Sequence, residues 1–331
     1  MNPPILSVNN LCVSFSTLRG DVNVIDNLNF SIGPGEILGI VGESGSGKSV
    51  TALAIMQLLG QNGNISQGSV NLADKEISSL DEEGMLQVRG VELAMIFQEP
   101  MTSLNPVYTV GFQIAETLIE HLNYSPPQAM EEAVHLMEQV GIPDAGARVT
   151  EYPHQMSGGM RQRVMIAMGL ACKPKFLIAD EPTTALDVTI QAQILRLLMK
   201  LRDEMNMGIM LITHDMGVIA EIADQVMVMY CGQAVESASV SDIFNQPRHP
   251  YTRLLLNSIP LVIEKKDRLD TIEGNVSTPA NYVSGCRFSP RCPLAIDACR
   301  QSSIPIKEIM PGRKVRCIRV DETELIDRLG V

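Results

Sequence analysis

Residues 42–49 read Gly-Glu-Ser-Gly-Ser-Gly-Lys-Ser, which fits the pattern G-x-x-x-x-G-K-[ST]. They follow the apolar run 37–41, which is typical of a strand buried on both faces, and they lead into a helical pattern at 49–59. Glycines at this spacing let backbone N–H groups surround phosphate oxygens, and a helix N-terminus adds its positive dipole end. A flexible linker is the alternative, but the flanking strand and helix argue against it. The segment therefore predicts a nucleoside triphosphate-binding loop.

The side chains of this loop have separate expected roles. Lys48 would pair with the β- and γ-phosphates of ATP, and Ser49 would hold Mg²⁺. The residues that we expect to bind the nucleotide here are Gly42, Ser44, Gly45, Gly47, Lys48 and Ser49.

A second acidic motif ends another apolar run. Residues 176–179 read Phe-Leu-Ile-Ala, and Asp180 and Glu181 follow directly. The carboxyl ends of parallel strands are where an α/β sheet binds its ligand. We expect Asp180 to reach Mg²⁺ and Glu181 to orient or deprotonate the attacking water. The alternative is a pair of acids that only caps the next helix.

The remaining periodicity indicates an α/β fold. From about 86 to 170 the pattern is mostly helical, with amphipathic stretches at 110–122 and 127–140, and from 176 onward strands and helices alternate. This order predicts a mixed or parallel sheet with an inserted α-helical subdomain. Short strand patterns fill the N-terminal part, at 5–8, 11–15, 22–25, 28–32 and in an expected hairpin at 63–72.

Residues 156–163 read Met-Ser-Gly-Gly-Met-Arg-Gln-Arg. This resembles the signature motif of the nucleotide-binding subunits of ABC transporters, usually Leu-Ser-Gly-Gly-Gln, with Met156 in place of the Leu and Met160 in place of the Gln. The resemblance implies that Ser157, Gly158 and Gly159 complete the ATP site of a partner subunit across a head-to-tail dimer. A Ser-Gly-Gly turn before a helix suits this role, because it offers backbone donors and a dipole end to phosphate.

Four other positions match the same family in order. Gln98 resembles the glutamine that senses Mg²⁺ and connects the core to the helical subdomain, and His214 resembles the histidine that contacts the γ-phosphate. Phe15 stands where the family stacks an aromatic ring on adenine, and 185–187 resembles a dimer-contact loop. The resemblance covers about residues 4–260 and implies a catalytically competent ATPase.

The segment at 245–252 contains His-Pro-Tyr and resembles the ATPases of oligopeptide and dipeptide importers, a subgroup that also serves nickel, opine and glycoside import. The resemblance implies a second ABC ATPase subunit, expected to be a paralogous heterodimer partner. It also implies two transmembrane permease subunits and an extracellular or periplasmic substrate-binding protein. We expect an ATPase domain at 1–255 and a C-terminal extension at 256–331.

The extension contains four cysteines whose spacing resembles the [4Fe–4S] set of that subgroup: Cys286, Cys292, Cys299 and Cys317. Between 281 and 320 there are eight Lys or Arg residues and two acids, which gives +6 in a chain of net charge −12. Such a basic shell would lower the pKa of the thiols and stabilise an anionic cluster. Zinc, and thiols without metal or in disulfides, are the alternatives.

The net charge and the amino-acid composition argue against some classes of binding partner. The chain has 331 residues, a net charge of −12 and no Trp, so a nucleic-acid partner is not expected. A soluble ABC-type ATPase that acts on nucleic acid remains the distant alternative. The sequence contains no apolar run long enough to cross a bilayer and no visible secretory signal. We therefore expect a peripheral protein at the cytoplasmic face of the inner (plasma) membrane.

Overall fold

The computed structural model describes residues 3–98, 103–184, 186–258, 272–327 and 329. The chain forms two compact units that are each assembled from distant segments. Unit 1 comprises 1–6, 32–36 and 79–211, and unit 2 comprises 7–31, 37–78 and 212–331. The phosphate-binding loop therefore belongs to unit 2, whereas the pair of acids after residue 179 belongs to unit 1.

Unit 1 contains parallel strands whose residues are almost all apolar. β6 (Leu93–Ile96) pairs in parallel with β7 (Phe176–Asp180), with Leu93 opposite Phe176. β8 (Gly208–Ile212), all but its last residue in this unit, lies next to β7. Every residue of β7 and β8 is buried, as expected for strands that are covered on both faces.

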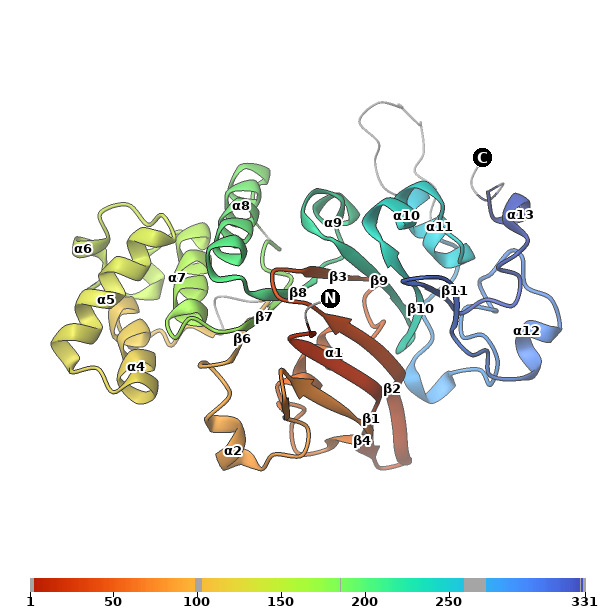
Figure 1. Cartoon of the computed structure of the whole chain (residues 1–331), viewed down its shortest axis with the longest axis horizontal. Coiled ribbons are helices and arrows are strands. Elements are labelled where there is room, and N and C mark those ends of the chain that lie inside the picture. Colours follow the sequence, from red (N-terminus) through yellow and green to blue (C-terminus); the bar gives the residue numbers. More distant parts are fainter. Residues whose placement is uncertain (1–2, 99–102, 185, 259–271, 328, 330–331) are drawn as a thin grey trace. The chain divides into compact units, whose positions relative to one another are not determined.

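The inserted helices of unit 1 begin at clear capping signals. Thr109 accepts a hydrogen bond from the backbone of Phe112 at the start of α4, and Ser125 forms a capping box with Gln128 at the start of α5. Figure 1 shows α4, α5, α6 and α7 grouped together, and α4, α5 and α7 pack on one another. The helices are α2 (Glu82–Leu86), α4 (Val110–Leu122), α5 (Pro126–Gln139), α6 (Ala145–Arg148), the 3₁₀ turn η1 (Pro153–Gln155), α7 (Gly158–Leu170) and α8 (Val188–Met205).

Unit 2 contains the strand that precedes the phosphate-binding loop. β3 (Ile37–Val41) is buried throughout and pairs in parallel with β9 (Gln225–Tyr230), which pairs antiparallel with β10 (Gln233–Ser239). In this unit the strand order is β11-β12-β10-β9-β3. The helices around these strands are α1 (Lys48–Ile55), α9 (Met216–Ile222), α10 (Val240–Asn245) and α11 (Pro250–Asn257).

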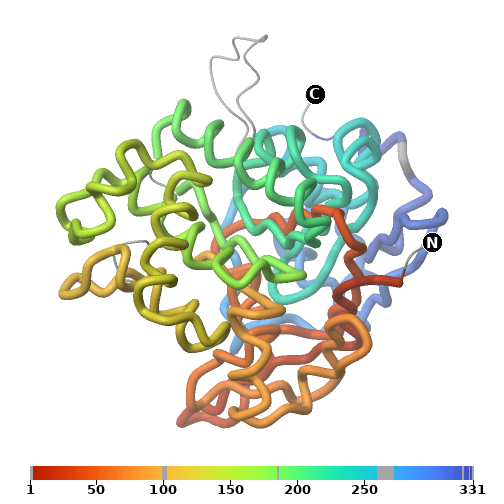
Figure 2. The backbone as a smooth tube through the Cα atoms, turned by 60° about the vertical axis from the view of Figure 1, so that its left-hand side comes forward, coloured from red at the N-terminus to blue at the C-terminus, as the bar shows by residue number. Residues whose placement is uncertain are grey.

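A second sheet of unit 2 has the order β2-β1-β4-β5, and Figure 2 shows its red and orange strands side by side. Its strands are β1 (Leu6–Thr17), β2 (Gly20–Ile32), β4 (Gly63–Leu72) and β5 (Lys75–Glu76). The prediction of four short strands before residue 33 was wrong, since the chain forms two long strands there. Asn10 and Asn27, whose φ angles are 48° and 50°, lie inside these two strands and do not interrupt them. The expected hairpin at 63–72 is also wrong: Gly68, at φ 94°, lies in one strand against the Asn10 backbone.

The C-terminal segment contributes to unit 2 by strand pairing. β12 (Arg313–Val315) pairs antiparallel with β10, with Val315 opposite Glu236, and with β11 (Lys307–Met310). The other elements are η2 (Pro279–Asn281), α12 (Ala298–Gln301) and α13 (Thr323–Asp327). The separate extension from residue 256 stays a prediction. Within the described part of the chain, no helix has the length and apolar character that spanning a bilayer requires.

Candidate nucleotide-binding site

The phosphate-binding loop follows a backbone path that needs glycine. Gly42, Gly45 and Gly47 have positive φ, at 151°, 80° and 103°. A Cβ on Gly42 would lie 2.2 Å from the carbonyl oxygen of Met229, and a Cβ on Gly47 would lie 2.6 Å from Ile25 Cδ1. Side chains are therefore excluded at these two positions, and the loop lies directly against β9 and β2.

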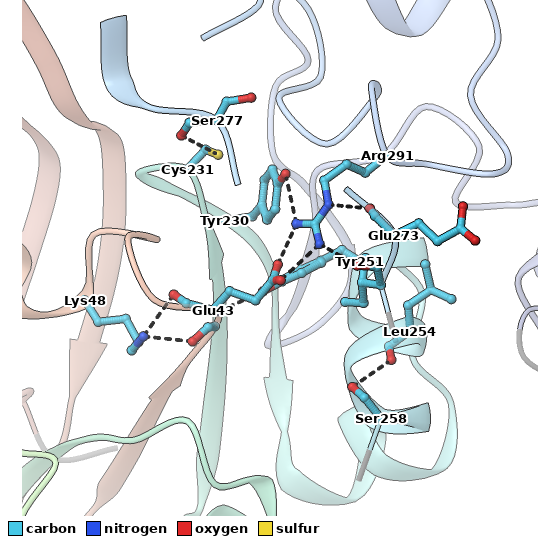
Figure 3. Close-up of polar contacts among 12 residues, drawn as sticks. Glu43, Lys48, Tyr230, Cys231, Tyr251, Leu254, Ser258, Glu273, Ser277 and Arg291 are labelled. Carbon is cyan, nitrogen blue, oxygen red and sulfur yellow. Dashed lines mark hydrogen bonds and ion pairs between the residues drawn. The ribbon is translucent and has the colours of Figure 1, made fainter. Parts of the chain in front are cut away.

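Lys48 is the buried cation of this loop. Its ammonium group donates to the carbonyl oxygens of Gly42, at 2.8 Å, and Glu43, at 3.1 Å (Figure 3). Ser46 Oγ is buried and has no hydrogen-bond partner among the described residues, and Ser49 is exposed in the first turn of α1. An ammonium, the buried hydroxyl of Ser46, the exposed Ser49 and a helix N-terminus together suit a phosphate chain.

Two other expected nucleotide contacts lie in unit 2. Phe15 is half-buried on β1 beside Gly63, where an added Cβ would lie 2.8 Å from Phe15 Cε1. His214 is exposed just after β8, and the next residue, Asp215, caps α9 by accepting from the backbone N–H of Gly217 at 2.8 Å. Their roles toward adenine and the γ-phosphate stay predictions.

Unit 1 brings Gln98 and Glu181 into contact across 83 residues of sequence. Gln98 Nε2 donates to Glu181 Oε2 at 2.9 Å, and Thr184 Oγ1 donates to the same oxygen at 2.8 Å. Glu181 has a φ of 47°, a strained conformation that is uncommon outside glycine and clusters at functional sites. Asp180 is buried at the end of β7. The acidic strand end and its glutamine therefore form one cluster.

The expected signature residues lie at the start of α7. Ser157 is exposed and caps the helix by accepting a hydrogen bond from the backbone of Met160 at 3.3 Å. A Cβ on Gly158 would have no neighbour within 4 Å among the described residues, whereas one on Gly159 would lie 2.9 Å from Ile190 Cγ2. Gly159 thus serves the packing of α7 on α8, and Ser157 with Gly158 present an open helix N-terminus. Of the expected dimer-contact loop, residue 185 lies outside the described residues.

The predicted iron–sulfur site is wrong. The four cysteines of the C-terminal segment do line one small cavity together with His249 and Phe288. Across the described residues, however, no group of three or more His, Cys, Asp or Glu side chains is arranged to hold a metal ion. All seven cysteines, each of them described, are free thiols. This geometry overturns the zinc alternative as well as the [4Fe–4S] cluster.

The basic side chains near the four cysteines do not lower the pKa of the thiols enough to make them thiolates. Arg287 pairs with Asp26 at 2.8 Å and Arg319 pairs with Glu322. The charge of Arg319 lowers the pKa of Cys292, but by less than burial raises it. Desolvation dominates at the thiols instead: burial raises the pKa of Cys292 to about 11 and that of Cys317 to about 12. The basic composition of the segment therefore does not produce thiolates.

Three contacts to the loop could not be found from motifs. The backbone N–H of Glu43 donates to Tyr251 Oη at 2.9 Å, and both carboxylate oxygens of Glu43 accept from Arg291, at 2.7 and 3.0 Å (Figure 3). Arg291 follows Glu43 by 248 residues. The one available signal was the His-Pro-Tyr segment, which contains Tyr251.

A glycine-lined turn before a helix, together with a buried strand that ends in two acids, defines a P-loop ATPase. Residues 25–184 match the family model "ABC transporter", and residues 235–299 match "Oligopeptide/dipeptide transporter, C-terminal region". The chain belongs to the ATP-binding proteins of the ABC transporter family.

Known proteins resemble the chain over most of its length. It is 52% identical to the oligopeptide transport ATP-binding protein AppD of Bacillus subtilis (strain 168), over 96% of this chain and 97% of AppD. A dimeric ATP-binding cassette, MJ0796, solved with ADP and Pi, matches with 26% identity and a TM-score of 0.64, over 71% of this chain and 98% of MJ0796. The protein cbiO1 of Clostridium perfringens, part of the ABC transporter complex cbiONQ, has a TM-score of 0.63 and 26% identity, over 73% of this chain and 91% of cbiO1.

Proposed function

We propose that this chain hydrolyses ATP to drive the import of di- or oligopeptides through a membrane ABC importer. One observation carries the choice of substrate: the match of residues 235–299 to the C-terminal region of oligopeptide and dipeptide transporters, supported by the likeness to AppD over nearly the whole chain. Nickel import, or opine or glycoside import, within the same subgroup is the second candidate.

The proposed chemistry assigns one task to each site residue. Lys48 binds the β- and γ-phosphates, and His214 contacts the γ-phosphate. Glu181 accepts a proton from water as the water oxygen bonds to the γ-phosphorus and the bond to ADP breaks, and Gln98 holds the Glu181 carboxylate at 2.9 Å. Phe15 stacks on the adenine ring.

Mg²⁺ suits the oxygen donors that the family assigns to it. The hydroxyl of Ser49, the side-chain amide oxygen of Gln98 and the carboxylate of Asp180 would hold it, and hard oxygen ligands of this kind are those that Mg²⁺ prefers. When bound, Mg²⁺ would neutralise developing charge on the phosphate oxygens.

The proposed assembly places a second ATPase subunit opposite the open N-terminus of α7, so that Ser157, Gly158 and Gly159 complete the partner's ATP site. The partner is expected to be a paralogue. Two permease subunits and a substrate-binding protein complete the importer, and this chain lies at the cytoplasmic face of the membrane. Gln98 would couple the helical subdomain to the acidic strand end, so closure of the site would reach the permeases.

The decisive experiment reconstitutes the complete transporter in lipid vesicles and measures ATP hydrolysis with each candidate substrate and its binding protein. We expect a mixture of di- and oligopeptides to stimulate hydrolysis, and Ni²⁺ to have no effect. Stimulation by Ni²⁺ alone would instead support the nickel importer. A variant complex with Lys48→Ala tests whether the signal comes from this chain.

A further inference from the structure

Glu43, the second residue of the phosphate-binding loop, is held at three atoms by residues from the C-terminal part of the chain. Its backbone N–H donates to Tyr251 Oη at 2.9 Å, where Tyr251 lies on α11. Its two carboxylate oxygens accept from the two terminal nitrogens of Arg291, at 2.7 and 3.0 Å. Its carbonyl oxygen accepts from Lys48 (Figure 3). Glu43 is therefore bound both by the phosphate-binding lysine and by Tyr251 and Arg291, which we call the clamp.

Arg291 is itself rigidly placed. Its side chain is 5% exposed, and its guanidinium also donates to the carbonyl oxygens of Glu273, at 2.9 Å, and Ile272, at 3.1 Å. A planar guanidinium that binds a carboxylate through two parallel hydrogen bonds fixes the direction of that carboxylate as well as its position. Arg291 therefore transmits the position of the segment after residue 272 to the loop.

The environment favours the ion pair over a looser contact. Burial is the largest single influence on the pKa of the Arg291 guanidinium and lowers it, but the hydrogen bonds and charges of Glu43 and Tyr230 together raise the pKa overall. Tyr230, Tyr251 and Phe288 form an aromatic cluster beside it, with ring centroids 4.8 to 5.2 Å apart. These packed rings leave the guanidinium few alternative positions.

We propose that Arg291 is a positioning residue for nucleotide binding, which acts through Glu43 to hold the phosphate-binding loop in its anion-accepting path. The loop has three glycines with positive φ, so it would lose much conformational freedom on binding if it were unrestrained. Ordering the loop beforehand removes that cost from the binding step. The C-terminal segment thereby sets the affinity of the ATP site. This inference rests on the loop being the nucleotide site.

The test measures ATP and ADP binding to the full-length chain by isothermal titration calorimetry, together with KM and kcat for ATP hydrolysis. We expect Arg291→Ala and Glu43→Gln each to raise the Kd and KM about tenfold, and kcat to change by less than about twofold, because the clamp acts on binding and not on the chemical step. Arg291→Lys keeps the charge but loses the two-pronged geometry, so its effect should be nearly as large.

A double variant and a matched control separate this role from simple stability. The double variant, Arg291→Ala with Glu43→Gln, should bind nucleotide no worse than either single variant, because both remove one contact. The control is Arg287→Ala, which removes a similar ion pair, to Asp26 at 2.8 Å, without touching Glu43. It should leave the Kd unchanged.

Two results would overturn the proposal. One is an unchanged Kd in Glu43→Gln, a variant at a loop position that can be made even if Arg291→Ala does not fold. The other is an Arg287→Ala variant that weakens binding as much as Arg291→Ala does. Lys48→Ala tests the nucleotide site separately from the positioning role. If Lys48→Ala binds ATP normally, the loop is not the nucleotide site. If Lys48→Ala loses ATP binding but Glu43→Gln keeps the wild-type Kd, only the positioning role of Arg291 is wrong.

Discussion

At the scale of single residues, the two glycines at 42 and 45 show how differently the same backbone requirement is enforced. Both have positive φ, but a Cβ on Gly42 would meet the Met229 carbonyl at 2.2 Å, whereas one on Gly45 would have no described atom within 4 Å. Gly42 is thus required by conformation and by space, and Gly45 by conformation alone. This difference can be measured, because the two positions lie in the same loop.

We expect Gly42→Ala to lower the free energy of unfolding by about 3 kcal/mol or more, since backbone strain of about 1–3 kcal/mol adds to the overlap with the carbonyl. Gly45→Ala should cost only about 1–2 kcal/mol, the penalty of a left-handed conformation. Urea unfolding of the two variants beside the wild type measures both values. Equal losses would contradict the packing of the loop against β9.

Glu181 is expected to be the base of the reaction, because its carboxylate is held by Gln98 and Thr184 through one oxygen. Glu181→Gln should still bind ATP but lower kcat by about 100-fold or more, the usual contribution of a general base. Calorimetry gives the Kd and phosphate release gives kcat. The matched control is Glu120→Gln, an exposed glutamate of α4 in the same unit, which should hydrolyse ATP at the wild-type rate. Wild-type turnover in Glu181→Gln would exclude the assignment.

His249 makes the stability of the chain depend on pH. Burial, and next the charge of Arg316, lower its pKa to about 3 from 6.5. Because the folded pKa is depressed, the neutral ring stabilises the fold above pH 6.5, and this contribution is lost as the pH falls from 6.5 towards 3. The ring Nδ1 of His249 accepts from the backbone N–H of Tyr251 at 3.1 Å, and the backbone N–H of His249 donates to Glu236 Oε2 at 2.8 Å.

Between pH 7 and pH 5 the wild type should therefore lose about 2 kcal/mol more unfolding free energy than His249→Asn, in which the amide oxygen can still accept from Tyr251. Urea unfolding at the two pH values measures the difference. His154→Asn, at an exposed histidine, serves as the comparison and should follow the wild type. A parallel loss in all three proteins would show that His249 is not the group responsible.

At the scale of elements, the sequence predicted those features that depend on local pattern. The expected helix at 110–122 is α4, which its periodicity and the Thr109 cap define, and the expected strand before the loop is β3, which its apolar run defines. The sequence prediction broke β1 and β2 into two short strands each. Asn10 and Asn27 are residue types that favour turns, but here they are single left-handed residues within long strands. Asparagine adopts a left-handed conformation in turns and within strands alike, so its presence in the sequence does not distinguish the two.

The candidate site divides in the same way. The loop and the pair Asp180 and Glu181 could be read directly, because each motif is contiguous. Contacts across long stretches of sequence could not be read, which applies to Gln98 with Glu181 and to Arg291 with Glu43. The cysteine prediction was wrong for a related reason: composition counts charges, but burial raises the pKa of Cys286 and Cys292 more than the nearby arginines lower it.

At the scale of the whole molecule, substitutions at Gly158 and Gly146 can separate an effect on folding from an effect on the assembly of the transporter. Gly158 and Gly146 are both exposed, and a Cβ on either would have no described neighbour within 4 Å. Gly158 lies at the open N-terminus of α7, whereas Gly146 lies in α6. A charged side chain should therefore be tolerated by the fold at both positions, yet only one of them faces the proposed partner site.

We expect Gly158→Asp to change the unfolding free energy by no more than about 0.5 kcal/mol and to leave ATP binding to the isolated chain intact. In the assembled transporter it should nearly abolish ATP hydrolysis, because a carboxylate at the helix N-terminus would repel the phosphates held by the partner subunit. Gly146→Asp should preserve hydrolysis. Full activity of Gly158→Asp in the reconstituted complex would mean that the N-terminus of α7 does not complete a partner's ATP site, whereas weaker ATP binding to the isolated chain would place its role within a single subunit.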